Sequence, residues 1–301
     1  EVSSGAMKKI WYKCGKKVGK KLYVTIGILF CIIGVVIVFF NIPYSKTKME
    51  FTKITNCLAN EATDASDVFI EEDIADLPLS VQKYFWYCGY IGTPKMSYMK
   101  ATYKDVDFLF GKDKPPIKID YTQYNFVNKP NRVAYIDSTM YGIPFEGLDS
   151  CISGIGSMKG IVGKLFPLFN QTGEVMDKAS LATFLSECLI IPNAALQSYI
   201  TWEEIDVLHA KAAISCNGIT VNGIFTFKEN GEMYSFATDD REAVSTDGSR
   251  EKVKWSVVYS EYEETNGIKK PTVFKAIWHY DDGDLIYFNG KDVKISFQIH
   301  E

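Results

Sequence analysis

The chain has 301 residues, of which 47% are hydrophobic and 14% aromatic, and a formal net charge of −4. Residues 1–21 contain seven lysines and one glutamate, a net charge of +6 that leaves −10 for the remainder. An acidic remainder argues against nucleic acid as a partner and against docking on anionic lipid head groups. We therefore expect no nucleic-acid partner.

An uncharged apolar run covers residues 22–42. A helix rises about 1.5 Å per residue, so this run is long enough to cross a hydrocarbon core of roughly 30 Å. Seven lysines precede it, and only Lys46, Lys48 and Lys53 follow closely. The positive-inside bias thus predicts a single-pass protein of the cytoplasmic membrane, with its N-terminus inside and its C-terminal domain extracytoplasmic. A cleaved signal peptide is the alternative, but residues 39–42 offer no small side chain for cleavage.

Composition and hydropathy divide the chain into four expected parts. These are a basic cytoplasmic tail (1–21), a transmembrane helix (22–42), a polar and acidic stalk or linker (43–76) and an extracytoplasmic domain (77–301). A chain of the length of the last part can bury one large β-rich core.

Two helices are predicted in the external domain. In residues 77–92, Val81, Phe85 and Cys88 recur at helical spacing before Gly89. Residues 174–191 carry a second apolar stripe that ends at a proline, and a further turn or two can follow to about residue 200.

The remaining pattern has a period of two and predicts strands. Aromatic and β-branched runs cover residues 121–127 and 132–141, and the glycine-rich stretch 153–163 indicates twisted strand with tight turns. In the C-terminal third, alternating apolar residues are separated by Asn-Gly or Asp-Gly pairs, which predict hairpin turns. These pairs are at 217–218, 230–231, 266–267 and 282–283. We expect an α+β fold, mainly antiparallel β, in which a strongly curved sheet or half-open barrel has helices covering one face.

The seven cysteines are irregularly spaced, without a Cys-x-x-Cys pair, and five of them follow the apolar run. An odd number with this spacing does not indicate a disulfide framework. We expect buried free thiols that folding does not require, with one bridged pair as the alternative in an oxidising compartment.

Signatures of catalysis are not found in the sequence. The three histidines are scattered, and neither a His-Glu-x-x-His motif nor a Gly-x-Ser-x-Gly motif occurs. We therefore predict no catalytic residue, no metal site and no cofactor.

Aromatic residues in or beside strands are the positive signal. The candidate ligand-binding residues are Tyr124, Trp202, Trp255, Trp278 and Tyr287. A curved sheet covered by helices at 77–92 and 174–200 is expected to enclose a cavity, with Trp202 and Trp278 as its markers. Because the domain is acidic, we expect this cavity to hold an apolar ligand without a basic pocket.

Six segments between residues 77 and 297 carry a resemblance to a known family. They are LPLSVQKYFWYCGYIGTPK, TQYNF, GLDSCISGIGSM, YITWEEID, VNGIFTF and IKKPTVFKAIWHYDDGDLIYF. In this order they resemble the motifs of an uncharacterised bacterial family, domain of unknown function 6544, a resemblance that implies no activity. In the family pattern a basic residue often precedes the aspartate of the third motif. Here Leu148 precedes Asp149 and Cys151 replaces an aromatic residue, so the resemblance does not support a charge pair at Asp149.

The order of strands and helices is also similar to that of lipoprotein carriers of the LolA and LolB type. In these proteins a half-open barrel with a helical lid shelters acyl chains. This second resemblance implies the same general fold and a lipid-like ligand.

Three functions remain in competition. The leading hypothesis is a membrane-anchored extracytoplasmic protein that binds an apolar or lipid-like ligand in a sheet cavity. A hydrolase of cell-envelope substrates is the enzymatic alternative, with carboxylates from Glu203, Asp206 and Asp149; Asp149 and Asp206 are also the polar site candidates. The third is a sensor or assembly factor whose partner is another envelope protein.

Overall fold

The computed structural model describes residues 3–62, 67–112, 114–245 and 248–298. The chain divides into two compact units, residues 1–44 and 45–301. The first contains helix α1 (Ser3–Asn41), which is long and apolar enough to cross a membrane. This agrees with the predicted span and leaves its orientation open.

Among the described residues, the second unit has three α-helices. They are α2 (Lys46–Glu61), α3 (Leu79–Cys88) and α4 (Glu174–Glu187), with short 3₁₀ turns at Glu71–Ile74 and Pro192–Ala194. The hydroxyl of Ser45 accepts a hydrogen bond from the backbone N–H of Lys48 and so caps α2. Gly89 ends α3 with a φ of 76°, as its position after the apolar stripe predicts.

The strands of this unit number sixteen in the described residues. They are β1 (Tyr98–Phe108), β2 (Ile117–Phe126), β3 (Asn131–Met140), β4 (Ile143–Ile152), β5 (Ile155–Val162), β6 (Phe166–Thr172), β7 (Ile200–Asp206), β8 (His209–Cys216), β9 (Ile219–Phe227), β10 (Met233–Thr238), β11 (Glu242–Val244), β12 (Arg250–Lys252), β13 (Lys254–Thr265), β14 (Ile268–Tyr280), β15 (Gly283–Gly290) and β16 (Lys294–Gln298). Fourteen of them form one sheet, and β11 and β12 pair as a separate hairpin.

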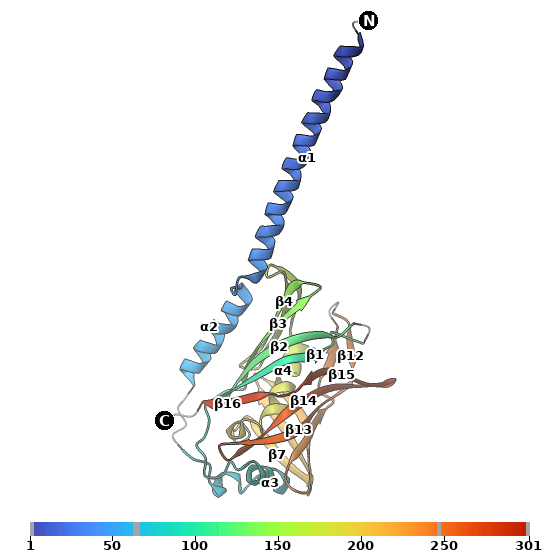
Figure 1. Cartoon of the computed structure of the whole chain (residues 1–301). Coiled ribbons are helices and arrows are strands. Elements are labelled where there is room, and N and C mark those ends of the chain that lie inside the picture. Colours follow the sequence, from blue (N-terminus) through green and yellow to red (C-terminus); the bar gives the residue numbers. More distant parts are fainter. Residues whose placement is uncertain (1–2, 63–66, 113, 246–247, 299–301) are drawn as a thin grey trace. The chain divides into compact units, whose positions relative to one another are not determined.

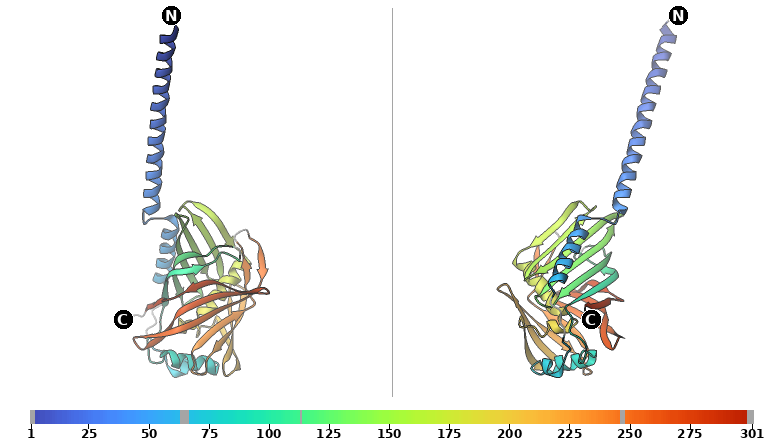
Figure 2. Two further views of the ribbon diagram at one scale, coloured as in Figure 1. Left: turned by 45° about the vertical axis from the view of Figure 1, so that its right-hand side comes forward. Right: turned by 90° about the vertical axis from the view of Figure 1, so that its left-hand side faces the viewer.

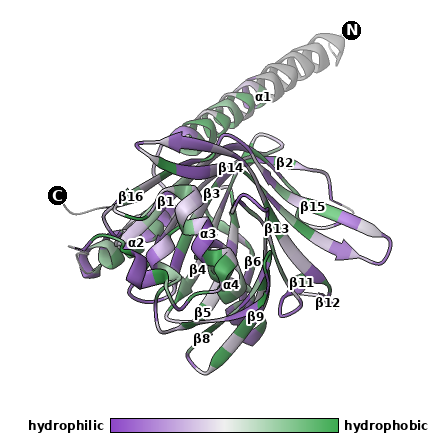
Figure 3. Cartoon of the chain, turned by 90° about the horizontal axis from the view of Figure 1, so that it is seen from below, coloured by the Kyte–Doolittle hydropathy of each residue, from purple (hydrophilic) through white to green (hydrophobic). Residues whose placement is uncertain are grey.

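The large sheet consists of two antiparallel meanders joined edge to edge. Its order is β6-β5-β4-β3-β2-β1-β15-β14-β13-β10-β9-β8-β7, and β1 pairs with β15 where the two meanders meet. Strand β16 returns to pair with another part of β1 instead of continuing the C-terminal meander. The sheet curves strongly (Figures 1 and 2), and α4 connects β6 to β7 within the curve (Figure 3). The predicted curved, mainly antiparallel sheet is therefore present.

The two faces of the sheet are covered by different helices. Successive side chains of β3 point to opposite faces of the sheet. Ala134 and Ile136 lie in the main core, on the side of α4, and Tyr135 lies on the opposite face. There the ring of Phe51, from α2, lies 5.6 Å from the ring of Tyr135. The expectation that helices cover one face is thus incomplete, because α2 packs on the other.

Residues 43–76, expected as a stalk or linker, belong largely to the folded unit. Helix α2 packs on the sheet through Phe51, and an ion pair joins Glu50 to Lys159 of β5 at 2.6 Å. The polar and acidic residues that indicated a stalk lie mostly after this docked helix, at 60–67 and 71–73, and of these residues 63–66 lie outside the described part of the chain.

The five cysteines that follow the apolar run are free thiols, and three of them are buried as expected. Cys88, Cys151 and Cys188 are buried, Cys216 is half-buried and Cys57 is exposed. Burial raises the pKa of Cys88 to about 12, since an apolar environment disfavours the thiolate.

Candidate functional site

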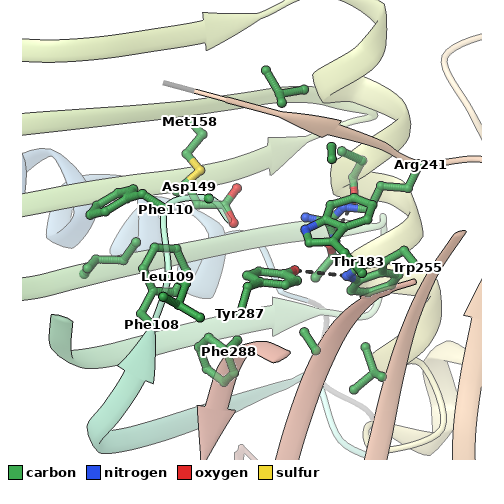
Figure 4. A pocket seen from close by; sticks show the side chains of 18 of the residues that line it. Phe108, Leu109, Phe110, Asp149, Met158, Thr183, Arg241, Trp255, Tyr287 and Phe288 are labelled. Carbon is green, nitrogen blue, oxygen red and sulfur yellow. Dashed lines mark hydrogen bonds between the residues drawn. The ribbon is translucent and has the colours of Figure 1, made fainter. Parts of the chain in front are cut away.

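A cavity of about 200 Å³ lies on the concave side of the sheet, bordered by α4. Residues of β2–β6 line one side and residues of β13–β15 the other, while the segment 108–111 and strand β11 complete the wall. Figure 4 shows Phe108, Leu109 and Phe110 at one side of the cavity and Arg241, Thr183 and Trp255 at the other. Residues from both meanders therefore meet at a single site.

Three predicted aromatic residues line this cavity together: Trp255, Trp278 and Tyr287. The rings of Trp278 and Tyr287 are stacked with centroids 5.8 Å apart. The indole N–H of buried Trp255 donates to the hydroxyl of half-buried Tyr287 at 3.0 Å, so each side chain has a hydrogen-bond partner at its polar end (Figure 4). This wall therefore presents mainly ring faces to the cavity, with the polar atoms of Trp255 and Tyr287 paired to each other.

Arg241 lies over this aromatic wall. Its guanidinium carbon is 4.3 Å from the ring centroid of Trp255 and 5.4 Å from that of Trp278, within the range of cation–π attraction. One terminal nitrogen donates to the hydroxyl of Thr183 at 2.8 Å, whereas the buried Nε has no hydrogen-bond partner. Within the described part of the chain, no carboxylate forms an ion pair with Arg241. The side chain therefore offers unused donors and uncompensated charge to the cavity.

A second arginine, Arg132 of β3, is buried in the cavity wall within a polar network. It donates to the carboxylate of Asp149 at 2.7 Å, and its Nε lies 3.5 Å from the carboxylate of Glu187. It also donates to the hydroxyl of Tyr121 and to the side-chain oxygen of Gln123. Arg132 is thus neutralised by its neighbours.

The charge state of this network follows from burial and pairing. Burial raises the pKa of Glu187, and the nearby Arg132 opposes that rise. Burial alone lowers the pKa of Arg132, but the adjacent Asp149, Tyr121 and Glu187 outweigh it and hold the pKa well above its ordinary value. The amides of Gln123 and Asn125 donate to Glu187 at 2.6 and 2.9 Å and complete its hydrogen bonding.

These arginines correct two expectations from the sequence. Asp149 does form a charge pair, but its partner, Arg132, comes from the neighbouring strand and not from the adjacent residue. The cavity is also not free of basic side chains, because Arg132 and Arg241 both line it.

The other predicted site residues lie away from the cavity. Tyr124 packs beside Phe51 on the opposite face of the sheet, 5.9 Å between ring centroids. Trp202 packs on Phe225 and donates to the backbone oxygen of Ala195. Helix α3, which was expected to help enclose the chamber, contributes no residue to its lining.

The carboxylates proposed for a hydrolase are not brought together. Asp206 is exposed at the end of β7, where it accepts hydrogen bonds from the backbone N–H groups of Leu208 and His209, and Glu203 pairs with Lys211 at 3.2 Å. Neither lines the cavity with Asp149. Over the described residues, the acidic, cysteine and histidine side chains form no cluster that could hold a metal ion.

One constellation was missed by the sequence reasoning. On the convex side of β13–β15, Ser256 Oγ lies 2.7 Å from His279 Nε2, and His279 Nδ1 lies 2.7 Å from Asp284. This is the order of a Ser-His-Asp triad. Ser256, however, is buried and does not line the cavity, so an acyl substrate has no described place beside its hydroxyl. The three residues are best described as a cross-strand hydrogen-bonded row.

Comparisons with known proteins identify the family expected from the sequence. A family model described as "Family of unknown function (DUF6544)" matches residues 67–290. A crystal structure of a LolA superfamily protein from Nitrosomonas europaea is similar at 11% sequence identity and a TM-score of 0.37, covering 73% of this chain and 94% of that chain. No curated protein matches the chain.

Proposed function

Since the chain belongs to the family of unknown function DUF6544, which assigns it no activity, we propose a function from the cavity itself. The protein binds a small amphiphile, with the apolar body against the aromatic wall and an anionic head group at Arg241. It is held at the cytoplasmic membrane by residues 22–42, with the second unit outside. The observation that carries the proposal is an aromatic-lined cavity containing an arginine whose Nε is buried and unpartnered.

The volume limits the size of the apolar body. A dry cavity of about 150 Å³ is large enough for benzene, so the 200 Å³ here suits one ring or one short chain. A two-chain lipid does not fit between the walls as they stand. Burying about seven methylene groups at roughly 0.8 kcal/mol each corresponds to a dissociation constant of about 0.1 mM before ordering costs.

The head group is inferred from the chemistry of Arg241. A guanidinium presents a planar set of donors that matches a carboxylate or phosphate, and stacking on Trp255 fixes its orientation. Arg132 is a poorer candidate, because Asp149 and Glu187 already neutralise it. The ligand class is therefore a single-chain or single-ring organic anion.

Octanoate and octan-1-ol test this proposal, because they share a chain and differ in charge. Each is titrated into the full-length protein in nanodiscs while tryptophan fluorescence is followed. We expect octanoate to bind near the value above, Arg241→Met to weaken octanoate about tenfold, and octanol binding to change little.

Arg250→Met is the matched control, because Arg250 is an exposed arginine on β12 that does not line the cavity. Failure of both compounds to bind would remove the proposal. Equal binding of octanoate to the wild type and Arg241→Met would leave an apolar site and remove the head-group assignment.

A further inference from the structure

Two neighbouring hairpin ends of the second unit carry large apolar side chains in solvent. The β3–β4 turn exposes Tyr141 and Ile143, which are 92% and 41% exposed, and the β5–β6 turn exposes Leu165 and Phe166, at 58% and 68%. The two turns are adjacent, because the backbone N–H of Gly163 donates to the carbonyl of Pro144 at 2.7 Å. We call these four side chains the hairpin-tip patch.

Tyrosine is not the residue that the backbone conformation at position 141 favours. Tyr141 and Gly142 have φ values of 52° and 80°, a conformation in which asparagine is favoured and a bulky residue is strained. At two other hairpins this chain uses Asn217 and Asn266, with φ values of 52° and 53°. The backbone conformation of the turn therefore does not explain the choice of an exposed tyrosine at this position, which points to a role for the side chain in binding.

The link between the apolar run and the folded unit is short. The apolar run ends at Ile42, and Ser45 already belongs to the folded unit, so at most about 10 Å of extended chain separates them. Ser45 caps helix α2, which packs on β3 through Phe51, whose ring lies 5.6 Å from that of Tyr135. From Tyr135 the strand continues to Met140, five residues or about 16 Å toward the β3–β4 turn. With so short a tether at Ser45, the β3–β4 turn is within reach of the bilayer surface.

We propose that the hairpin-tip patch lies in the interfacial region of the outer leaflet of the membrane that anchors the chain. The proposal rests on the anchoring stated under the proposed function. Tyrosine and phenylalanine at the tips suit this region, where an aromatic ring has both apolar and polar surroundings.

This position has a consequence for the cavity. The segment joining β1 to β2 lies at the same end of the sheet, because Phe108 pairs with Ile117 and the ring of Phe110 is 5.3 Å from that of Phe145. Phe108 and Phe110 both line the cavity. The cavity wall at 108–111 therefore faces the bilayer, from which an amphiphile would enter.

Brominated lipids test the patch, because they quench only tryptophans close to the acyl chains. Phe166→Trp and, separately, Leu165→Trp are made in the full-length protein and reconstituted into vesicles of phosphatidylcholine with or without brominated chains.

Val207→Trp is the matched control: Val207 is an exposed apolar residue (61%) in the β7–β8 turn. It lies near α3, whose Leu79 N–H donates to Glu204, at the end of the domain away from the hairpin tips (Figures 1 and 2). Tyr23→Trp, within the apolar run, reports insertion of the chain.

The added fluorescence at positions 165 and 166 should fall at least twofold in brominated vesicles, while that at position 207 should be unchanged. Equal responses at 166 and 207 with a quenched Tyr23→Trp would overturn the patch while leaving the anchor intact. An unquenched Tyr23→Trp would overturn the anchoring itself, and the patch with it.

Discussion

Replacing Arg132 with methionine is expected to destabilise the fold strongly, and to do so in a pH-dependent way. The change removes the counter-charge of two carboxylates, Asp149 and the buried Glu187. Breaking a buried ion pair by deleting one partner typically costs about 3–5 kcal/mol, because the remaining charge is desolvated and unpaired. Urea unfolding of the full-length protein in detergent, followed by tryptophan fluorescence, measures this loss.

The pH dependence follows from Glu187. Burial raises its pKa above the ordinary value of 4.5, so its protonation favours the folded state, and that stabilisation is lost as the pH rises through the folded-state pKa. Without Arg132 this pKa rises further. The loss of stability in Arg132→Met should therefore be larger at pH 8 than at pH 5, and Glu187→Gln added to it should recover part of the loss at pH 8.

A surface pair provides the comparison. Lys118→Met breaks an exposed pair with Asp107 and should cost no more than about 1 kcal/mol at either pH. If Arg132→Met cost as little as this control, or cost the same at pH 5 and pH 8, the reasoning about a buried charge network would be refuted.

Two further outcomes are expected. Burial raises the pKa of Cys88 to about 12, so iodoacetamide at pH 8 should alkylate exposed Cys57 first and Cys88 only after unfolding. Peptide mass mapping measures the two rates, and equal rates in the folded protein would contradict this prediction. A Cβ on Gly156 would lie 2.2 Å from the carbonyl oxygen of Met176, so Gly156→Ala should lose about 1–3 kcal/mol in thermal or urea unfolding. Gly111→Ala, which meets nothing within 4 Å, should lose little, and the reverse order would argue against the close packing of β5 on α4.

The parts of the fold found from the sequence are those with local signals. The Asn-Gly pairs at 217–218 and 266–267 form hairpin turns, and apolar stripes located α3 and α4. Strand β1 was missed because a bulge with Asp105 at a φ of 51° interrupts its alternation. The pairing of β16 with β1 joins segments nearly 200 residues apart, which no local pattern encodes.

The site was found only in part, for a related reason. On β2 the polar Gln123 faces the core and the aromatic Tyr124 faces α2, so the usual assignment of polar and apolar faces selects the wrong residue. In the sequence, nothing distinguishes Arg132 and Arg241 from surface arginines. Their partners, Glu187 and Trp255, are distant in the chain and lie beside them only in the folded structure. Aromatic residues on strands therefore identified part of the site from the sequence, whereas its charged residues could be identified only from the tertiary structure.

The central claim is that the cavity holds an amphiphile, and native mass spectrometry of the full-length protein tests it most directly. The protein, purified from membranes and freed from its micelle in the gas phase, should retain a population with the added mass of one single-chain organic anion. Ala276→Phe should remove this population, because Ala276 lines the cavity between the two meanders and a phenyl ring there occupies the ligand's space. A wild-type protein that shows only its own mass, or an adduct that survives Ala276→Phe unchanged, would contradict the account.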